Sequence, residues 1–350
     1  MKKFLFKILI FSLPIISLGF EVFLPISTFT FRPDESLLFK HPGIGTPFYP
    51  NQRLEMQSVG DLCAYTEYSV NKNLLWLTDE IGYRNDVFIE NPDVVIIGDS
   101  FVLGSGSTQD STLANLLNSK FDHKLKFYNL APASLLELKV LLDNNIIKKP
   151  RLVIFELGER IIPQEFDLDA KGKPYKSTRT KIWLNKVTRL YSINFVLSRT
   201  FNKRTIGQQS EINKEMFFLM GENQINHLDK VGIIAETIGN YKSYCDSMGI
   251  CFLFLACPNK ESVYWEEVPS SEQPKYLFEL EKVLDLLNIS NINSLNVFNL
   301  YRQENETLIY HLDDTHWNSN GINLIAEEIV KEIITNQHLD IFGMTGLEKY

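Results

Sequence analysis

Short apolar runs alternate with helical patterns through the larger, second part of the chain. The runs span residues 94–97, 125–129, 152–157, 250–256 and 295–300, each bounded by turn residues. Apolar residues recur at helical spacing in residues 113–117, 135–142, 231–248, 277–287 and 322–334. Short apolar runs suit strands that are buried on both faces, and strands that alternate with helices build a parallel sheet between two helical layers. We therefore expect a three-layer α/β/α fold around a parallel sheet of about five strands.

The amino-terminal part has a different pattern. Lys2, Lys3 and Lys7 precede an uncharged run over residues 8–20. With Lys7 and Glu21 turned outward, residues 4–24 form a helix that at ~1.5 Å per residue covers the ~30 Å hydrocarbon layer of a bilayer. We predict that residues 1–25 are a membrane anchor. The alternative is a cleaved secretory signal, although the run has no Ala-x-Ala signal. Both interpretations place the rest of the chain outside the cytoplasm, in the periplasm or at the cell surface, or secreted.

Domain boundaries follow from the same patterns. Residues 26–90 are rich in Pro and aromatic residues and show little periodicity, so they are predicted to be a linker and an irregular preface. Residues 91–340 are predicted to form one folded domain, with a long insertion at residues 161–224.

Composition narrows the choice of function. The 350 residues are 44% hydrophobic and 22% charged, which excludes a disordered chain, a collagen-like repeat and a multi-span membrane protein. A net charge of -8 offers no positive field for nucleic acid. The four cysteines lack a Cys-x-x-Cys spacing, so we expect them to pack in the core rather than bind zinc. One disulfide is open to them in an oxidising compartment.

The first strand of the pattern ends in a turn that carries a serine. Gly98, Asp99 and Ser100 follow residues 94–97. Ligands bind at the carboxyl ends of strands in such sheets, where Gly98 permits a tight bend and the next helix offers backbone N–H groups. Ser100 is therefore a candidate nucleophile. A helix cap is the alternative role for a serine at this place.

A second motif near the carboxyl terminus supplies the missing partners of a nucleophilic serine. A histidine must take the proton of the hydroxyl group, and a carboxylate must hold the imidazole in the right tautomer. His316 and Asp314 lie within one short segment ahead of the last helical pattern, with Asp313 as the alternative carboxylate. Taken alone, Asp314 could cap that helix and His316 could lie on the surface. Together with Ser100, the three residues predict a catalytic triad.

These motifs resemble those of the SGNH (GDSL-type) hydrolase superfamily, with its flavodoxin-like sheet. Gly98-Asp99-Ser100-Phe101 is similar to the first block of that superfamily, and the segment from Asp314 to Asn318, with Gly321 behind it, is similar to the last. Within the superfamily the chain is more similar to the alginate O-acetyltransferase type. That likeness is carried by residues 149–160, by Pro258-Asn259-Lys260 with Tyr264 and Pro269, and by residues 310–317.

The resemblance implies an extracytoplasmic O-acyltransferase that works through an acyl-serine and needs no metal or bound cofactor. Its acceptor would be a cell-surface or exported polysaccharide, and its acyl donor a membrane-bound acyltransferase. Two other classes stay open. One is an esterase that removes acyl groups from carbohydrate or lipid, and the other is a non-catalytic scaffold that binds polysaccharide.

The chain departs from the simple esterases of the superfamily at the oxyanion hole. Those enzymes use a glycine after the second strand and the asparagine of Gly-x-Asn-Asp after the third, whereas this chain has Asn129 to Ala133 and Gly158-Glu159-Arg160 there. The Ser100 backbone N–H is one candidate donor. The second candidates are Asn129, the Ala131 and Ala133 amides and Arg160. Glu156, Glu159 and Arg160 have a structural ion network as their alternative role.

The insertion is strongly basic. Between residues 166 and 204 it carries ten Lys or Arg against two Asp. Its apolar residues recur at helical spacing and predict an amphipathic helix: Trp183, Leu184, Val187, Leu190, Tyr191 and Val196. A basic lid near the strand tops could meet an acidic polysaccharide, and the same helix could lie on anionic lipid headgroups near the anchor. A solvated face that packs its apolar side on the core is the third interpretation.

Overall fold

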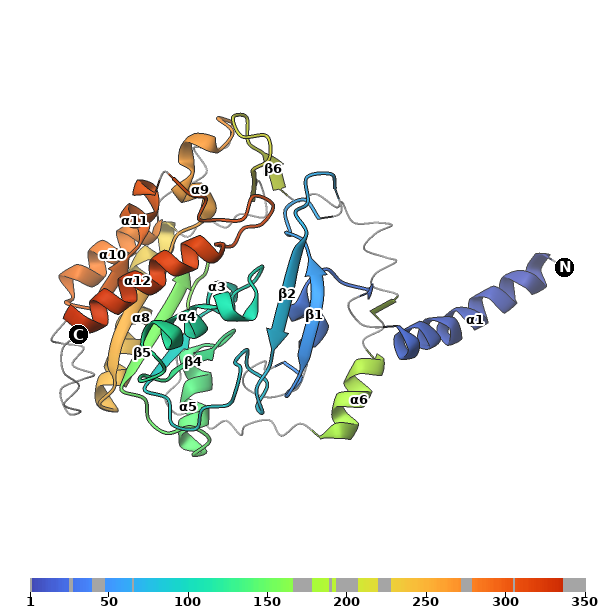
Figure 1. The fold of residues 1–350 in the computed structure, drawn as a ribbon, viewed down its shortest axis with the longest axis horizontal. Helices are drawn as coiled ribbons and strands as arrows, with labels where there is room; N and C mark the ends of the chain where they lie inside the picture. The colour runs from blue at the N-terminus through green and yellow to red at the C-terminus, as the bar shows by residue number, and fades with distance from the viewer. Residues whose placement is uncertain are drawn as a thin grey trace.

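The computed structural model describes residues 2–24, 28–39, 48–64, 66–165, 178–188, 191–192, 207–219, 228–271, 279–304 and 306–335. Its centre is a parallel sheet of five strands in the order β4-β3-β5-β8-β9 (Figure 1). The strands are β3 (Val94–Ile97), β4 (Phe127–Leu130), β5 (Leu152–Gly158), β8 (Cys251–Cys257) and β9 (Ser294–Asn296). Counted within the sheet this order is 2-1-3-4-5, the flavodoxin-like arrangement. The predicted α/β fold class is confirmed.

Helices cover both faces of this sheet because successive strand residues point to opposite sides. Val94 and Ile96 belong to the core on the side of α4 (Leu113–Lys120) and α12 (Ser319–Thr335). Val95 and Ile97 belong to the core on the opposite side. That side is covered by α5 (Leu135–Asp143), α8 (Val231–Ser247) and α10 (Glu279–Ile289). Burial on both faces explains why the strands read as continuous apolar runs.

The segment before the sheet is more regular than its sequence pattern predicts. It contains the short helix α2 (Pro33–Leu37) and an antiparallel hairpin of β1 (Arg53–Ser58) and β2 (Lys72–Leu77). In β1 only Met56 and Ser58 are buried, so most of the strand is polar and gives no apolar alternation. Trp76 of β2 is fully buried in the core on the α4 and α12 side. The prediction of an irregular preface is wrong over these strands.

The last strand is shorter than predicted. The apolar run 295–300 divides between β9, which ends at Asn296, and the helix α11 (Phe298–Gln303). The Asn296 side chain accepts a hydrogen bond from the amide of Phe298, the first residue of that helix, at 3.0 Å. Two further short helices lie at strand ends, α3 (Ser100–Leu103) after β3 and α9 (Lys260–Val263) after β8. The insertion contributes a second hairpin, β6 (Gly207–Gln209) with β7 (Phe217–Leu219).

One helix among the described residues is long and apolar enough to cross a membrane. It is α1 (Lys2–Phe23), and most of its side chains are exposed. Its inner end contacts the insertion: the Ser17 and Ser192 hydroxyls lie 2.6 Å apart, and Glu21 accepts a hydrogen bond from the Ser192 amide at 2.5 Å. A helix of this kind serves equally as an anchor or as a signal sequence.

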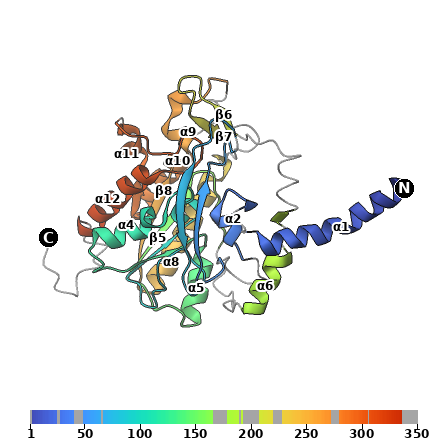
Figure 2. The same ribbon diagram turned by 45° about the vertical axis from the view of Figure 1, so that its right-hand side comes forward.

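The hairpin and the helix of the insertion lie in different places. The hairpin of β6 and β7 contacts the segment before His316, since the Phe217 amide donates to the Leu312 carbonyl oxygen at 2.9 Å, but the helix lies away from the strand tops. This helix, α6 (Arg179–Thr188), lies beside the inner end of α1, on the far side of the β1–β2 hairpin from the sheet (Figures 1 and 2). Trp183 and Leu184 are exposed there, while Asn185 accepts a hydrogen bond from the Tyr49 hydroxyl. The expectation of a lid is therefore wrong for this helix. Leu190 and Val196 lie outside the described residues.

Candidate active site

The turn that carries Ser100 forms at the carboxyl end of β3, as the sequence predicts. The Asp99 side chain caps α3 by accepting a hydrogen bond from the Phe101 amide at 2.8 Å. Glu156 of β5 accepts one from the Asp99 amide at 3.0 Å. A Cβ atom on Gly98 would lie 2.4 Å from a Glu156 carboxyl oxygen, so only glycine lets the two strands approach so closely. The turn that carries Ser100 is thus held by a hydrogen bond to the neighbouring strand β5.

The surroundings of Glu156 favour the protonated carboxyl group over the ion. Burial raises the pKa of Glu156 well above the ordinary value, and the negative charge of Asp99 raises it further. In the protonated form Glu156 would hold the nucleophile turn without adding a second negative charge near Ser100.

His316 is presented by a short closed loop. Tyr310 and Trp317 pair as an antiparallel bridge, and the His311 amide donates to the His316 carbonyl oxygen at 3.1 Å. The Trp317 indole N–H donates to the Phe101 carbonyl oxygen at 3.1 Å. The Phe101 ring lies 5.1 Å from the imidazole and 5.2 Å from the indole, between centroids. These contacts join residues 310–317, which we call the histidine loop, directly to the helix that begins with Ser100.

Ser100, His316 and Asp314 form a continuous hydrogen-bonded chain. His316 Nε2 lies 2.7 Å from Ser100 Oγ, and His316 Nδ1 lies 2.6 Å from Asp314 Oδ1. Burial alone would raise the pKa of Asp314, but the charge and hydrogen bond of His316 hold that pKa well below its ordinary value. A carboxylate on Nδ1 places the free lone pair of the imidazole on Nε2, toward the serine. The arrangement can remove the proton of the Ser100 hydroxyl group.

Asp313, the alternative carboxylate, has a different set of partners. One of its oxygens accepts from the Gly60 and Val70 amides at 2.7 and 2.9 Å, and the other accepts from Lys72 Nζ at 2.8 Å. Its side chain is fully buried. Asp313 therefore fastens the histidine loop to the β1–β2 region, and Asp314 is the residue that contacts the imidazole.

Several of the candidate oxyanion donors are already engaged. The Asn129 side chain donates to the Val102 carbonyl oxygen at 3.2 Å, and its backbone N–H donates to Asn85 at 2.9 Å. The Ala133 amide donates to the Gly98 carbonyl oxygen at 3.0 Å. Arg160 donates to the Thr315 hydroxyl at 3.1 Å, beside His316. The Ser100 amide, Ala131 and Arg160 stay as candidates.

Glu159 also has a structural partner. Its carboxylate accepts from the Asn259 amide at 2.9 Å and from the Ser262 hydroxyl at 2.5 Å. Glu156 and Glu159 thus hold the turns after β3 and β8, respectively, while Arg160 reaches the histidine loop. The three residues connect three loops at the same edge of the sheet.

A carboxylate that the sequence analysis did not select lies close to the triad. Oxygens of Asp61 and Asp314 and a ring nitrogen of His316 all lie within 4.8 Å of one another. Asp61 forms an ion pair with Arg32 at 2.5 Å, and burial together with the charge of Asp314 raises the pKa of Asp61. A metal ion here would compete for the Asp314 and His316 atoms that bond each other. Asp61 is therefore a second carboxylate beside the hydrogen-bonded chain of Ser100, His316 and Asp314.

No signal in the sequence marked Arg32 or Asp61 as site residues. Both lie in the aperiodic segment before the sheet, more than 200 positions from His316 along the chain. Only the folding of that segment over the carboxyl edge of the sheet brings them to the triad. His316 and Asp314 are consequently almost fully buried, at 6% and 5% exposure.

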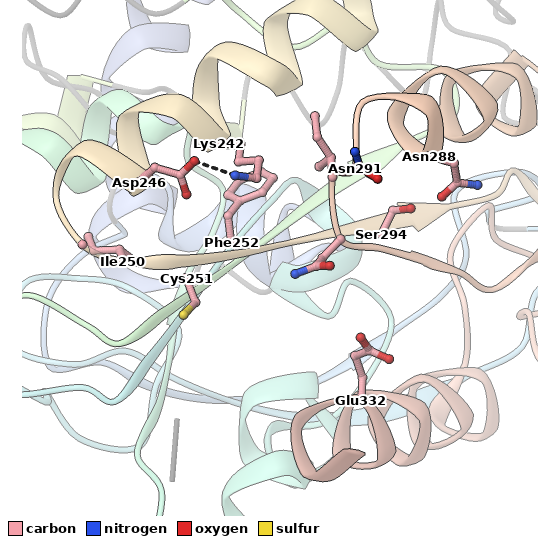
Figure 3. A pocket seen from close by; sticks show the side chains of 12 residues that line it. Lys242, Asp246, Ile250, Cys251, Phe252, Asn288, Asn291, Ser294 and Glu332 are labelled. Atoms are coloured by element: carbon pink, nitrogen blue, oxygen red, sulfur yellow. Dashed lines mark hydrogen bonds and ion pairs between the residues drawn. The ribbon is translucent and has the colours of Figure 1, made fainter. Parts of the chain in front are cut away.

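A polar hollow of about 860 Å³ lies elsewhere, at the amino ends of the strands (Figure 3). Cys251 and Ser294, which begin β8 and β9, contribute to its wall together with the Lys242–Asp246 ion pair. Ligands of open α/β sheets bind at the opposite edge. We therefore assign the chemistry to the Ser100 region and not to this hollow.

The cysteines take no part in the site. All four are free, and the disulfide that the sequence left open is not formed in the structure. Burial raises the pKa of Cys63 to about 11 and that of Cys245 to about 12. Both stay protonated and unreactive at neutral pH.

Comparison with known proteins finds a low overall similarity to several solved structures. No protein-family model and no curated protein sequence matches the chain. Among solved structures it is similar to a lipase/acylhydrolase from Enterococcus faecalis, with 12% identity and a TM-score of 0.38 over 70% of this chain and 95% of that one. It is also similar to a GDSL-like lipase from Bacteroides thetaiotaomicron, with 10% identity and a TM-score of 0.33 over 70% and 87%. A third is the salicylyl-acyltransferase SsfX3 from a tetracycline biosynthetic pathway, with 13% identity and a TM-score of 0.36 over 71% and 55%. Overlaps this low leave the function to be argued from the chain's own residues.

Proposed function

We propose that the protein is a serine-dependent acyl-transfer enzyme. The observation that carries this proposal is the hydrogen-bonded chain from Ser100 through His316 to Asp314, with contacts of 2.7 and 2.6 Å. Ser100 Oγ attacks the carbonyl carbon of an acyl donor while His316 Nε2 takes its proton. His316 then gives that proton to the departing group as the donor bond breaks, which leaves an acyl-serine. The Ser100 amide stabilises the oxyanion.

We further propose that a carbohydrate hydroxyl, rather than water, resolves the acyl-serine. His316 would deprotonate this hydroxyl, the new ester would form on the sugar, and Ser100 would recover its proton. Two observations support this choice over an esterase: the resemblance to polysaccharide O-acetyltransferases, and the burial of His316 and Asp314 behind the Arg32–Asp61 pair. Burial of these two side chains limits the access of water to them, while Ser100 itself is half-buried. The likeness to acetyltransferases makes acetyl the first acyl group to test.

A location at the outer side of a membrane fits the arrangement of α1 and α6. The exposed Trp183 and Leu184 lie on α6 with the exposed Arg179 and Lys181, beside the inner end of α1. Aromatic and basic residues together favour the interface of an anionic bilayer. We propose that α1 anchors the enzyme and that a membrane-bound acyltransferase supplies the acyl group, because acetyl-coenzyme A is confined to the cytoplasm.

The test uses the detergent-solubilised full chain with a chromogenic acetyl ester. We expect slow acetate release by the wild type, and acetylated sugar in the mass spectrum once an oligosaccharide is added. Ser100→Ala should abolish both. Rapid acetate release that no oligosaccharide redirects would leave the esterase. No Ser100-dependent turnover and no acyl-serine at all would leave the non-catalytic scaffold.

A further inference from the structure

A buried lysine lies directly beneath the histidine loop. Lys260 begins α9 at the carboxyl end of β8, and it is 1% exposed. Its ammonium group donates to the carbonyl oxygens of Phe217 at 2.7 Å, His311 at 2.6 Å and Leu312 at 2.9 Å, with that of Asp314 at 3.3 Å. All four acceptors are main-chain oxygens, and three belong to the loop that carries the two helpers of Ser100.

This placement needs an explanation, because an ammonium group is costly to bury. Four carbonyl dipoles converge on one point and would repel one another without a cation between them. The Phe218 ring, 5.4 Å from the ammonium nitrogen, adds a cation–π contact. The charge of Lys260 thus offsets the repulsion between the loop and β7, and the loop can keep its closed shape.

We propose that Lys260, in its charged form, is a positioning residue that holds the loop 311–316 so that Asp314 and His316 stay aligned on Ser100. The proposal rests on the acyl-transfer function for its effect on rate. Lys260 does not contact the reacting atoms and acts through the loop alone. The hydrogen bonds by which the charged amine holds the loop do not depend on which substrate binds.

The charge of Lys260 should be lost within an accessible pH range. Burial lowers its pKa to about 8, against the opposing attraction of Glu261, Asp314, Asp313 and Asp61. The loop also contains Asp313, Asp314, His316 and His311; of these, His311 stays neutral because burial lowers its pKa to about 3. Below pH 8 the ammonium has three hydrogens for the carbonyls. Above it the amine has two hydrogens and a lone pair, so one carbonyl faces a repulsive partner and the loop should loosen.

The first experiment measures kcat and KM of the full chain with the chromogenic acetyl ester from pH 6 to 10. We expect the wild-type kcat to fall about tenfold per pH unit above pH 8. Lys260→Met should lower kcat by about 100-fold at pH 7, the effect of a misplacement of about 1 Å, with KM within twofold and no alkaline decline. Lys260→Arg should keep the charge and move the decline beyond pH 9. Lys242→Met, which changes a partly exposed lysine of α8 paired with Asp246, is the matched control and should behave as the wild type.

A second measurement covers the case in which Lys260→Met fails to fold or the ester is no substrate. Hydrogen exchange of residues 311–316 is compared at pH 7 and pH 9, corrected for the intrinsic rate. The wild-type loop should lose at least tenfold in protection at pH 9, whereas Lys260→Arg should not. Equal protection at both pH values, or a kcat of folded Lys260→Met equal to wild type, would overturn the proposal. A failed ester assay with the expected exchange pattern would count against the acyl-transfer function only.

Discussion

Asp313 and Asp314 are adjacent and both buried, yet the structure predicts opposite consequences for their amide variants. In Asp314→Asn an amide NH2 or a neutral oxygen replaces the carboxylate 2.6 Å from His316 Nδ1. An NH2 group there stabilises the tautomer whose hydrogen is on Nε2, which cannot accept the proton of Ser100. Loss of the orienting carboxylate should lower kcat by up to ~10⁴-fold, which corresponds to about 5 kcal/mol of transition-state stabilisation. The loop contacts persist, so the melting temperature should change little.

Asp313→Asn perturbs stability instead. An amide oxygen can still accept from the Gly60 and Val70 amides, but the NH2 group then faces the Lys72 ammonium, which is 12% exposed. Removing one partner of a buried ion pair costs about 3–5 kcal/mol, and the partial exposure of Lys72 favours the lower value. At ~2–4 °C per kcal/mol for a domain of this size, the melting temperature should fall by roughly 10 °C. The kcat of the folded fraction should stay within a few-fold of wild type.

The two variants are compared by ester turnover at 20 °C and by thermal unfolding of the same preparations. The expected pattern is low kcat with normal stability for Asp314→Asn, and near-normal kcat with low stability for Asp313→Asn. A kcat loss of ~10⁴ in Asp313→Asn at an unchanged melting temperature would refute the assignment, and so would an active Asp314→Asn. A double variant should combine both defects if the two carboxylates act independently.

Three other predictions concern Glu156, Gly60 and the amino-terminal helix α1. Because burial favours the uncharged form of Glu156 and its oxygen accepts the Asp99 amide, Glu156→Gln should retain most of the kcat, whereas Glu156→Leu, which cannot accept that hydrogen bond, should lose it at similar expression. Gly60→Ala would place a Cβ atom 2.0 Å from the main-chain oxygen of Asp313, so both the melting temperature and the ester turnover should fall; Gly19→Ala, with open space around it, should change neither. Intact-mass analysis of the membrane fraction should find residues 1–25 retained, and a chain that begins near residue 20 would contradict the anchor.

The sheet could be predicted because its signal is local. The strands β3 and β5 are buried on both faces, so the apolar run itself identifies each of them, and Ser100 follows from its position after the first run. The pair of His316 and Asp314 could be selected from residue chemistry and spacing. The resemblance to the alginate O-acetyltransferase type favours Asp314 over Asp313; in the structure Asp314 contacts the His316 ring and Asp313 contacts Lys72.

The rest of the site depends on contacts between distant segments. Lys260 carries no local sign that its ammonium group turns inward onto main-chain oxygens more than forty positions away. Strand β1 gives no apolar signal because it buries only Met56 and Ser58 and is polar over most of its length. The position of α6 is set by α1 and by Tyr49, neither of which its own helical pattern indicates.

The contacts of Asp313 with Gly60, Val70 and Lys72 span 253, 243 and 241 positions of the chain. During synthesis the hairpin therefore emerges long before the loop that it must hold. Contacts of such long separation form late in folding, because the whole intervening chain must be closed into a loop first. Ser100 consequently stays without its base until the last segment has joined the first. A nascent chain would carry an inert serine, and the proposed chemistry could begin only after the complete domain has folded.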